Sequence, residues 1–198
     1  MIVLGLDTAV GACSAAVLAD GRPLAVHSEP MLRGHQERLA LMTREVMDEA
    51  GLRFDALDRV GVTVGPGSFT GLRVGLSFAK GLGLALARPV VGIGTLEALA
   101  ASEPGGDMIV TVIDARRGQV YLQAFSQGHA LMAPDVLALE TAAARLAELR
   151  PGGQVHVVGP GAALLEGLFP GAHISPRAAP DPVAVARLAQ AKPPTPAS

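Results

Sequence analysis

The chain is poor in aromatic residues, cysteine and basic clusters, and each shortage narrows the possible classes of protein. Only 3% of its 198 residues are aromatic and tryptophan is absent, so a core must be built mainly from alanine, valine, leucine and glycine. A single cysteine, Cys13, rules out an intrachain disulfide and fits a reducing cytosol, so we expect a cytoplasmic protein. The net charge of −2, without a concentration of Lys and Arg, argues against strong nucleic-acid binding by the chain alone.

Features of membrane or secreted proteins are equally scarce. The opening MIVLGLD lacks a basic flank and is interrupted by Asp7, so it predicts a strand rather than a signal peptide. The apolar helix pattern at residues 70–86 is too short and too interrupted by polar groups to span a bilayer, and we expect no membrane partner. Hydrophobic residues make up 49% of the chain, enough for a sizeable core in one large domain or two small ones.

Two segments of the chain share one pattern. Residues 2–18 and 109–125 each contain an apolar run, an aspartate, a short turn with glycine and a second apolar run. Aligning them places Asp7 on Asp114, and each segment predicts a β-hairpin whose first strand ends in a carboxylate. Further along, VTVGPG in the first half is matched by VVGPG in the second. Two matches in the same order favour an internal duplication.

Strand and helix patterns alternate along the chain, which predicts an α/β class with two similar layered lobes. The clearest linker is SEPGG at residues 102–106. We therefore expect a first lobe at 1–104 and a second lobe at 105–198, the latter including the C-terminal helix and a disordered PPTPAS tail. Strands are expected near 2–7, 12–18, 23–28, 60–64, 89–93, 108–114, 118–125 and 155–158. Helices are expected near 36–50, 70–86, 95–101, 140–149, 161–168 and 181–191.

The helix at 70–86 is unusually rich in glycine, although each glycine costs a helix about 1 kcal/mol relative to alanine. Small residues recur at every fourth position and form one stripe, which lets another helix or sheet approach closely. They are Gly67, Gly71, Gly75, Ala79, Gly83 and Ala87. Most of the remaining circumference is apolar, so the helix needs a second buried contact. That contact lies either within the chain or with a partner, and the pattern alone favours neither.

The two strand-end aspartates are the candidate chemical groups. Asp7, with the neighbouring Thr8, and Asp114 could hold a metal-bound nucleotide between two lobes. The alternative, that each aspartate caps its own hairpin turn, is favoured because no further site residue supports the nucleotide. The GPGSFTGLRVG stretch lacks the lysine of a P-loop. Its Ser68 lacks the surroundings of a nucleophile, so Ser68 or Thr70 is expected to cap the helix.

No histidine has a partner at the spacing of a helical metal site. The residue one turn after His35 is Leu39, so an H-x-x-x-H pair is not formed. We therefore expect neither a metal nor a catalytic residue, and solvated or capping roles for the histidines. The five are His27, His35, His129, His156 and His173.

Three segments together carry a specific family resemblance: GPGSFTGLRVGLSFAKGLG, the N-terminal LGLDTA and the helix opening HQERL. They resemble the TsaB (YeaZ) family over most of the chain. The resemblance implies an actin-like, sugar-kinase-type fold of two RNase H-like lobes, built from duplicated βββαβα units. It also implies a bacterial cytosolic protein of the machinery that makes threonylcarbamoyladenosine beside the tRNA anticodon. There the related TsaD subunit carries the metal and transfers the threonylcarbamoyl group, and the ATPase TsaE joins the complex.

The resemblance further implies a non-catalytic paralogue of TsaD that serves as its dimerisation partner. TsaD-like chains carry paired metal-binding histidines in the first helix, and the two positions correspond here to His35 and Leu39. The second lobe also ends early for the family, which weighs against a nucleotide cleft, so no cofactor is expected. Homodimerisation is expected when the chain is alone, and contact with tRNA only through the complex.

The helices at 36–50 and 70–86 are the expected partner-binding face, with Gly71, Gly75 and Ala79 permitting close approach. Its expected apolar contacts are Leu39, Met42, Val46, Leu72, Phe78 and Leu82. The alternative is an active two-lobed enzyme, either an ATP-dependent phosphotransferase or a peptidase-like protein, which would act without a partner.

Overall fold

A computed structural model describes residues 1–149, 153–167 and 171–193, and it divides into two compact units. The first unit comprises Met1–Ala98 together with the chain from Pro180 onwards, and the second comprises Leu99–Ala179. Each unit contains one mixed β-sheet. Among the described residues, no helix has both the length and the apolarity needed to cross a bilayer.

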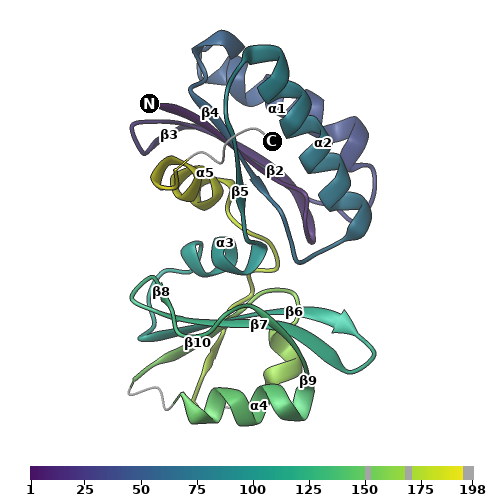
Figure 1. Ribbon diagram of the computed structural model, residues 1–198, viewed down its shortest axis with the longest axis vertical. Helices are drawn as coiled ribbons and strands as arrows, with labels where there is room; N and C mark the ends of the chain where they lie inside the picture. The colour runs from purple at the N-terminus through teal and green to yellow at the C-terminus, as the bar shows by residue number, and fades with distance from the viewer. Residues whose placement is uncertain (150–152, 168–170, 194–198) are drawn as a thin grey trace. The chain divides into compact units, whose positions relative to one another are not determined.

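The first unit has a five-stranded sheet in the order β3-β2-β1-β4-β5 (Figure 1). The central strand β1 pairs antiparallel with β2 and parallel with β4, and these pair in turn with β3 and β5. The strands are β1 (Ile2–Asp7), β2 (Ala12–Ala19), β3 (Arg22–Pro30), β4 (Arg59–Thr63) and β5 (Val90–Ile93). The helices are α1 (His35–Glu49), α2 (Phe69–Leu86) and α5 (Pro182–Ala191), with a short 3-10 turn η1 (Phe54–Ala56). The helix α3 (Thr95–Ala101) begins in the first unit and ends in the second.

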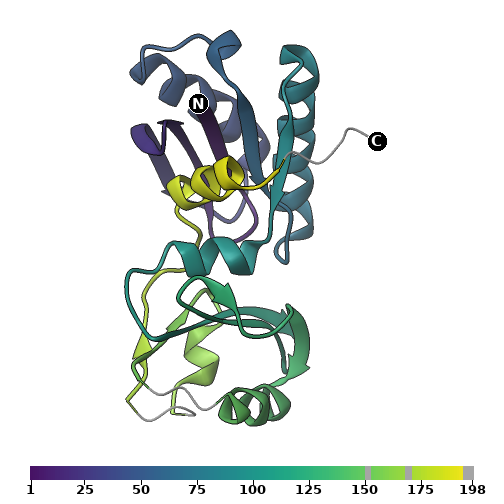
Figure 2. The same cartoon turned by 60° about the vertical axis from the view of Figure 1, so that its left-hand side comes forward.

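Alternation along the strands divides this unit into two cores. In β1, Leu4 and Leu6 face α1 and α2, whereas Val3 faces α5. This follows from the two-residue period of a strand, which sends successive side chains to opposite faces of the sheet. Figure 2 shows the yellow helix α5 lying across one face of the sheet, with α1 and α2 on the other.

The C-terminal helix α5 belongs to the first unit, so the division of the chain differs from the boundary expected at residue 104. Its side chains Val185, Ala186 and Ala189 cover the sheet face that α1 and α2 leave open. Gly5 and Gly61 permit this close approach, because a Cβ at Gly61 would lie 2.5 Å from the Cβ of Ala189. The expected disordered tail lies almost wholly outside the described residues, since the description ends at residue 193.

The second unit repeats the plan of the first. Its sheet has the order β11-β10-β6-β7-β8, with β9 also pairing β7. The central β6 pairs antiparallel with β7 and parallel with β10, as β1 does with β2 and β4, which confirms the duplication inferred from the sequence. The elements are β6 (Met108–Arg116), β7 (Gln119–Ser126), β8 (His129–Ala130), β9 (Asp135–Ala138), α4 (Leu139–Glu148), β10 (Val155–Val158), η2 (Ala162–Leu165) and β11 (His173–Ile174).

Three short strands were not expected, and one expected helix is shorter. β8, β9 and β11 contain two to four residues each, too few for a recognisable alternation. The helix expected at 161–168 is a single 3-10 turn at Ala162–Leu165, and residue 168 lies outside the described part of the chain.

Candidate partner-binding surface

Two small residues of α2, Gly71 and Gly75, pack against the protein's own β1–β2 turn. A Cβ at Gly71 would overlap the carbonyl oxygen of Thr8, and a Cβ at Gly75 would lie 2.5 Å from Thr8 Oγ1. The Thr8 hydroxyl donates a 2.8 Å hydrogen bond to the Gly71 carbonyl, which fixes the turn on the helix. Ala79 is also fully buried. The close approach that Gly71 and Gly75 permit is therefore internal. A partner contact through Gly71, Gly75 and Ala79 stays a prediction.

The expected apolar contacts on α1 are also internal. Leu39, Met42 and Val46 are at most 1% exposed and pack against the sheet core. Their spacing of three and four residues marks the face of α1 that covers the sheet. These three side chains thus serve the core of the first unit, and their contact with a partner stays a prediction.

The outer face of α2 is different. Phe69 is 69% exposed and Leu84 is 85% exposed, although both are large apolar side chains. The exposed residues Arg73, Ser77 and Lys80 lie between them on the same side of the helix. The guanidinium carbon of Arg73 lies 3.8 Å from the centre of the Phe69 ring, a cation–π contact that holds the ring over the helix. We call these five residues the outer α2 face.

Three further residues expected at the interface are intermediate in solvent exposure. Leu72, Phe78 and Leu82 are partly buried and, for Phe78 and Leu82, pack on the core of the first unit. Each presents part of its surface to solvent, so these three remain candidates for contact with a partner.

A groove of about 490 Å³ runs between α1 and α2 beside the outer α2 face. Gln36 and Leu39 line it from α1, and Phe78 lies in its wall. Its other lining residues are Phe69, Thr70, Arg73, Val74 and Ser77. A second hollow of about 340 Å³ adjoins the N-terminal ends of both helices, with Leu32 and Ser68 in its lining. The surface therefore combines an exposed aromatic side chain, a recess and flanking polar groups, as protein-binding surfaces do.

The start of α2 is shaped as the sequence predicted. Ser68 is the N-cap, and its hydroxyl accepts a 3.3 Å hydrogen bond from the Gly71 amide. The Ser68 amide itself donates to the carbonyl oxygen of Ala9 at 2.6 Å. Because Ser68 is bonded to the helix and its turn, these contacts support the capping role over a nucleophilic one.

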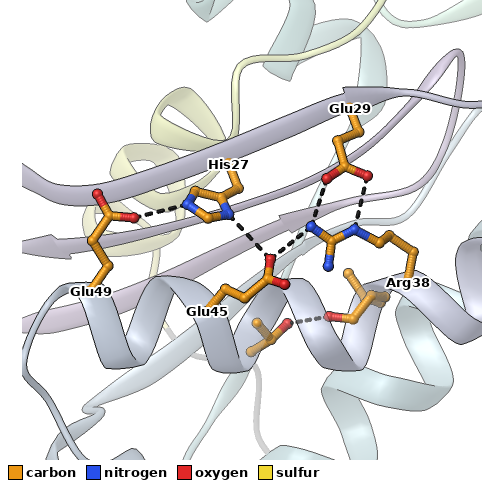
Figure 3. Close-up of polar contacts among 7 residues, drawn as sticks. His27, Glu29, Arg38, Glu45 and Glu49 are labelled. Carbon is orange, nitrogen blue, oxygen red and sulfur yellow. Dashed lines mark hydrogen bonds and ion pairs between the residues drawn. The ribbon is translucent and has the colours of Figure 1, made fainter.

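A network of charged side chains holds α1 against the edge strand β3 (Figure 3). The guanidinium of Arg38 donates hydrogen bonds to both carboxylate oxygens of Glu29, at 2.6 and 2.8 Å, and one of 2.7 Å to Glu45. His27 lies between Glu45 and Glu49, with ring nitrogens 3.4 and 2.8 Å from their carboxylates. Hydrogen bonds from Arg38 lower the pKa values of Glu29 and Glu45 and raise that of Arg38 itself. One wall of the groove is thereby fixed.

Asp7 and Thr8 are enclosed by the first unit. Asp7 is fully buried, and its Oδ1 accepts hydrogen bonds from the Thr63 hydroxyl at 2.6 Å and the Ala9 amide at 3.1 Å. Burial raises the pKa of Asp7 to about 6, although both hydrogen bonds act in the opposite direction. The bond to Ala9 is the turn-capping role that the sequence favoured.

Asp114 has the same role in the second unit. Its Oδ1 accepts a 2.7 Å hydrogen bond from the Arg116 amide, inside the β6–β7 turn. Arg116 and Arg117 adopt positive φ angles of 69° and 55° in that turn, which its tight reversal requires. Each aspartate of the duplicated hairpin is thus bonded to its own turn.

His35 and Leu39, the positions that correspond to the paired histidines of TsaD-like chains, are both buried in the first unit. His35 opens α1 and is only 5% exposed, and Leu39 one turn later is part of the core. An aliphatic side chain offers no ligand atom, so these two residues do not form a metal site.

With two duplicated sheets of this order, the first unit covered by helices on both faces, the protein is of the actin-like class. In agreement, it superposes with a TM-score of 0.55 on component A of the (R)-2-hydroxyglutaryl-CoA dehydratase of Acidaminococcus fermentans. That match covers 94% of this chain and 96% of the other at 15% identity, so it shows the fold alone.

Closer comparisons define the family. Residues 26–157 match the family model described as TsaD: tRNA N6-adenosine threonylcarbamoyltransferase. The structure of YeaZ from Pseudomonas aeruginosa matches 96% of this chain and 90% of its own, with a TM-score of 0.80 and 33% identity. The chain therefore belongs to the TsaB (YeaZ) family, as the sequence motifs indicated.

A curated relative from Escherichia coli (strain K12) is the tRNA threonylcarbamoyladenosine biosynthesis protein TsaB. It is 36% identical over 124 residues, which make up 61% of this chain and 53% of the relative. The chain thus spans about half the length of that relative in the match.

Sequence reasoning missed the outer α2 face. It grouped the apolar residues of α2 by helical position, but it could not tell which side the sheet covers. A signal was present, because Phe69 and Leu84 lie on the side of Arg73, Ser77 and Lys80, opposite the glycine stripe.

Proposed function

We propose that the chain acts in the biosynthesis of tRNA threonylcarbamoyladenosine as a non-catalytic subunit that binds and activates a TsaD-type transferase. Family membership supports the pathway, since the E. coli relative carries that name. The observation that carries the partner role is the exposure of Phe69 and Leu84 on the outer α2 face, beside the α1–α2 groove. Exposed aromatic and aliphatic side chains beside a groove are the kind of anchors that a protein partner buries.

The two residue sets that could have supported catalysis are used for structure. Leu39 occupies a core position where a metal-binding relative would need a ligand. Asp7 and Thr8 are buried, and their hydrogen bonds hold the β1–β2 turn to β4 and α2. These contacts favour a chain that works by being bound over one that reacts.

The proposed interface has one aromatic centre and a polar border. Phe69, braced by Arg73, is the expected energetic centre, because aromatic and arginine side chains contribute most at protein interfaces. Leu72, Phe78 and Leu82 add apolar area at its margin. A non-obligate interface of this type buries on the order of 1,600 Å² in total. Docking would stabilise the active conformation of the transferase by binding it more tightly than the inactive one.

Other associations follow from the same surface. When the transferase is missing, two copies of the chain would pair symmetrically through the outer α2 face. We further propose that a TsaE-type ATPase joins the complex in the cytoplasm. The net charge of −2 agrees with tRNA being bound through the complex rather than by this chain.

The test measures binding to a TsaD-type transferase by calorimetry. We expect Phe69→Ala to weaken binding at least tenfold, equivalent to about 1.4 kcal/mol, and Leu84→Ala to weaken it in the same direction. Leu131→Ala, which also removes an exposed leucine but from the second unit, is the matched control and should bind as the parent does. Circular dichroism confirms that each variant is folded.

Two results would overturn the proposal. Unchanged affinity in both Phe69→Ala and Leu84→Ala would remove the outer α2 face from the interface. Hydrolysis of ATP with magnesium, or peptide cleavage, by the purified chain alone would instead identify an enzyme.

A further inference from the structure

A second group of residues, in the second unit, brings three side chains together. Glu103 follows α3, His156 lies in β10 and His173 lies in β11. The two histidines are direct register partners on parallel strands, so their rings project to the same side of the sheet. The ring centres are 4.8 Å apart, and each of the three residues offers a ligand atom within 4.8 Å of the others.

The separations allow one metal ion to be shared by the three side chains. His156 Nδ1 and Glu103 Oε1 are 3.1 Å apart. Two ligand atoms bound to tetrahedral Zn²⁺ at about 2.0 Å lie roughly 3.3 Å from each other. His173 is exposed at the edge of the sheet, so its ring can rotate the remaining distance without disturbing the core.

The two inner ligands are held in place by their surroundings. The side chains of His156 and Glu103 are 11% and 6% exposed, and the Ser175 hydroxyl donates a 2.8 Å hydrogen bond to Glu103 Oε2. The backbone at Gly106 wraps closely around the imidazole, since a Cβ there would lie 3.0 Å from His156 Cδ2. Orientation of a ligand by a hydrogen-bonding neighbour is typical of metal sites.

We propose that Glu103, His156 and His173 bind one divalent transition-metal ion of the zinc class. Two imidazoles and one carboxylate suit Zn²⁺ in donor type, and a fourth position toward solvent on the His173 side is open to water. The ion would join the segment after α3 to β10 and to the two-residue edge strand β11. This site is separate from the outer α2 face, and it would stabilise the second unit whether or not a partner binds.

The experiment titrates the untagged full-length chain with ZnCl₂ by calorimetry and then records its thermal unfolding with and without the metal. We expect one zinc ion per chain and a higher unfolding temperature when it is bound. His173→Asn, an exposed position, should weaken zinc binding at least tenfold. Glu103→Gln should do the same, because it keeps a hydrogen-bonding group for Ser175 and His156 but removes the charge. His129→Asn, an exposed histidine of the same unit, is the matched control and should bind as the parent does.

The visible spectrum of bound Co²⁺ adds a readout of geometry, because four-coordinate cobalt absorbs much more strongly than six-coordinate cobalt. A strong spectrum that His173→Asn abolishes would support the site. The proposal is overturned if the parent chain binds no zinc, or if His129→Asn weakens binding as much as His173→Asn does. If Glu103→Gln fails to fold by circular dichroism, the comparison of the two exposed histidine variants decides the matter.

Discussion

Two glycines of α2 provide a sharp test of what the stripe is for. Gly71 and Gly81 lie in the same helix, and each can be replaced by alanine. At Gly71 the new methyl group would overlap the Thr8 carbonyl oxygen and lie 3.2 Å from its carbon. At Gly81 no atom of the described residues lies within 4 Å of the new methyl group. The added methyl group therefore collides with backbone atoms of Thr8 at Gly71 and extends into open space at Gly81.

The expected magnitudes follow from two opposing effects. Alanine is favoured over glycine inside a helix by about 1 kcal/mol, so Gly81→Ala should raise the free energy of unfolding by about that amount. Overpacking a well-filled site costs about 1–3 kcal/mol, and a backbone carbonyl cannot rotate away as a side chain can. After the gain in helix propensity is subtracted, Gly71→Ala should lower the free energy of unfolding by up to about 2 kcal/mol. The two variants should thus differ by about 1–3 kcal/mol, the full cost of overpacking.

The assay must report on the first unit. Tryptophan is absent and the one tyrosine, Tyr121, lies in the second unit, so intrinsic fluorescence would follow the wrong part of the chain. Urea unfolding followed by far-ultraviolet circular dichroism gives the midpoint, and hydrogen exchange of peptides from 69–86 assigns the change to α2. If Gly71→Ala proved as stable as Gly81→Ala, the stripe would not be packed on the β1–β2 turn, and its role as a partner surface would have to be reconsidered.

Two further predictions concern pH. Because burial raises the folded-state pKa of Asp7 from 3.8 to about 6, the native state retains a proton that the unfolded chain loses, and stability should fall as the pH rises between these values. Asp7→Asn should remove this decline and gain up to about 3 kcal/mol on the parent near pH 7, as urea unfolding across that range would show; parallel pH profiles would contradict it. Glu45 has a lowered pKa, so its contribution is present above its ordinary value of 4.5 and is lost as the pH falls through the lower folded-state value. Glu45→Gln should therefore lower the melting temperature at pH 7 but not in acid, and a deficit independent of pH would count against the Arg38 network.

Local features of the fold were predictable because their causes are local. The Ser68 cap and the hydrogen bonds from Asp7 and Asp114 to their own turns each involve residues two or three positions apart. Short-range geometry of this kind is written into a few adjacent residues. The repeated hairpin pattern in the sequence likewise predicted the repeated sheet order, because the same pattern forms the same strand pairing in both units.

The placement of α5 could not be predicted in this way. Its docking depends on Gly5 and Gly61, which lie far from it in the sequence and leave room for α5 at two points of that sheet face. Glycine within a strand is a signal of close backbone approach, but it does not say which helix approaches. The linker at residues 102–106 suggested a boundary, whereas the chain returns to the first unit at Pro180.

The convergence of His156 and His173 was hidden for a related reason. Metal-site motifs are recognised by spacing along one helix, and these histidines are brought together by strand pairing instead. One of the two strands, β11, has only two residues and leaves no alternating pattern to find. Sites assembled across strand edges need the register of the sheet before they can be seen.

The helix α2 shows how much its amino-acid composition can reveal about the contacts it makes. Its glycines correctly indicated an unusually close contact, and its apolar excess predicts a second one. The close contact is the one made with Thr8, since Gly71 and Gly75 leave no room for a Cβ there. The predicted second contact would use the opposite side, where Phe69 and Leu84 are exposed large apolar groups. A partner that binds this chain would therefore be recognised by side chains that project from α2, and the glycine stripe would determine only how firmly that helix is seated.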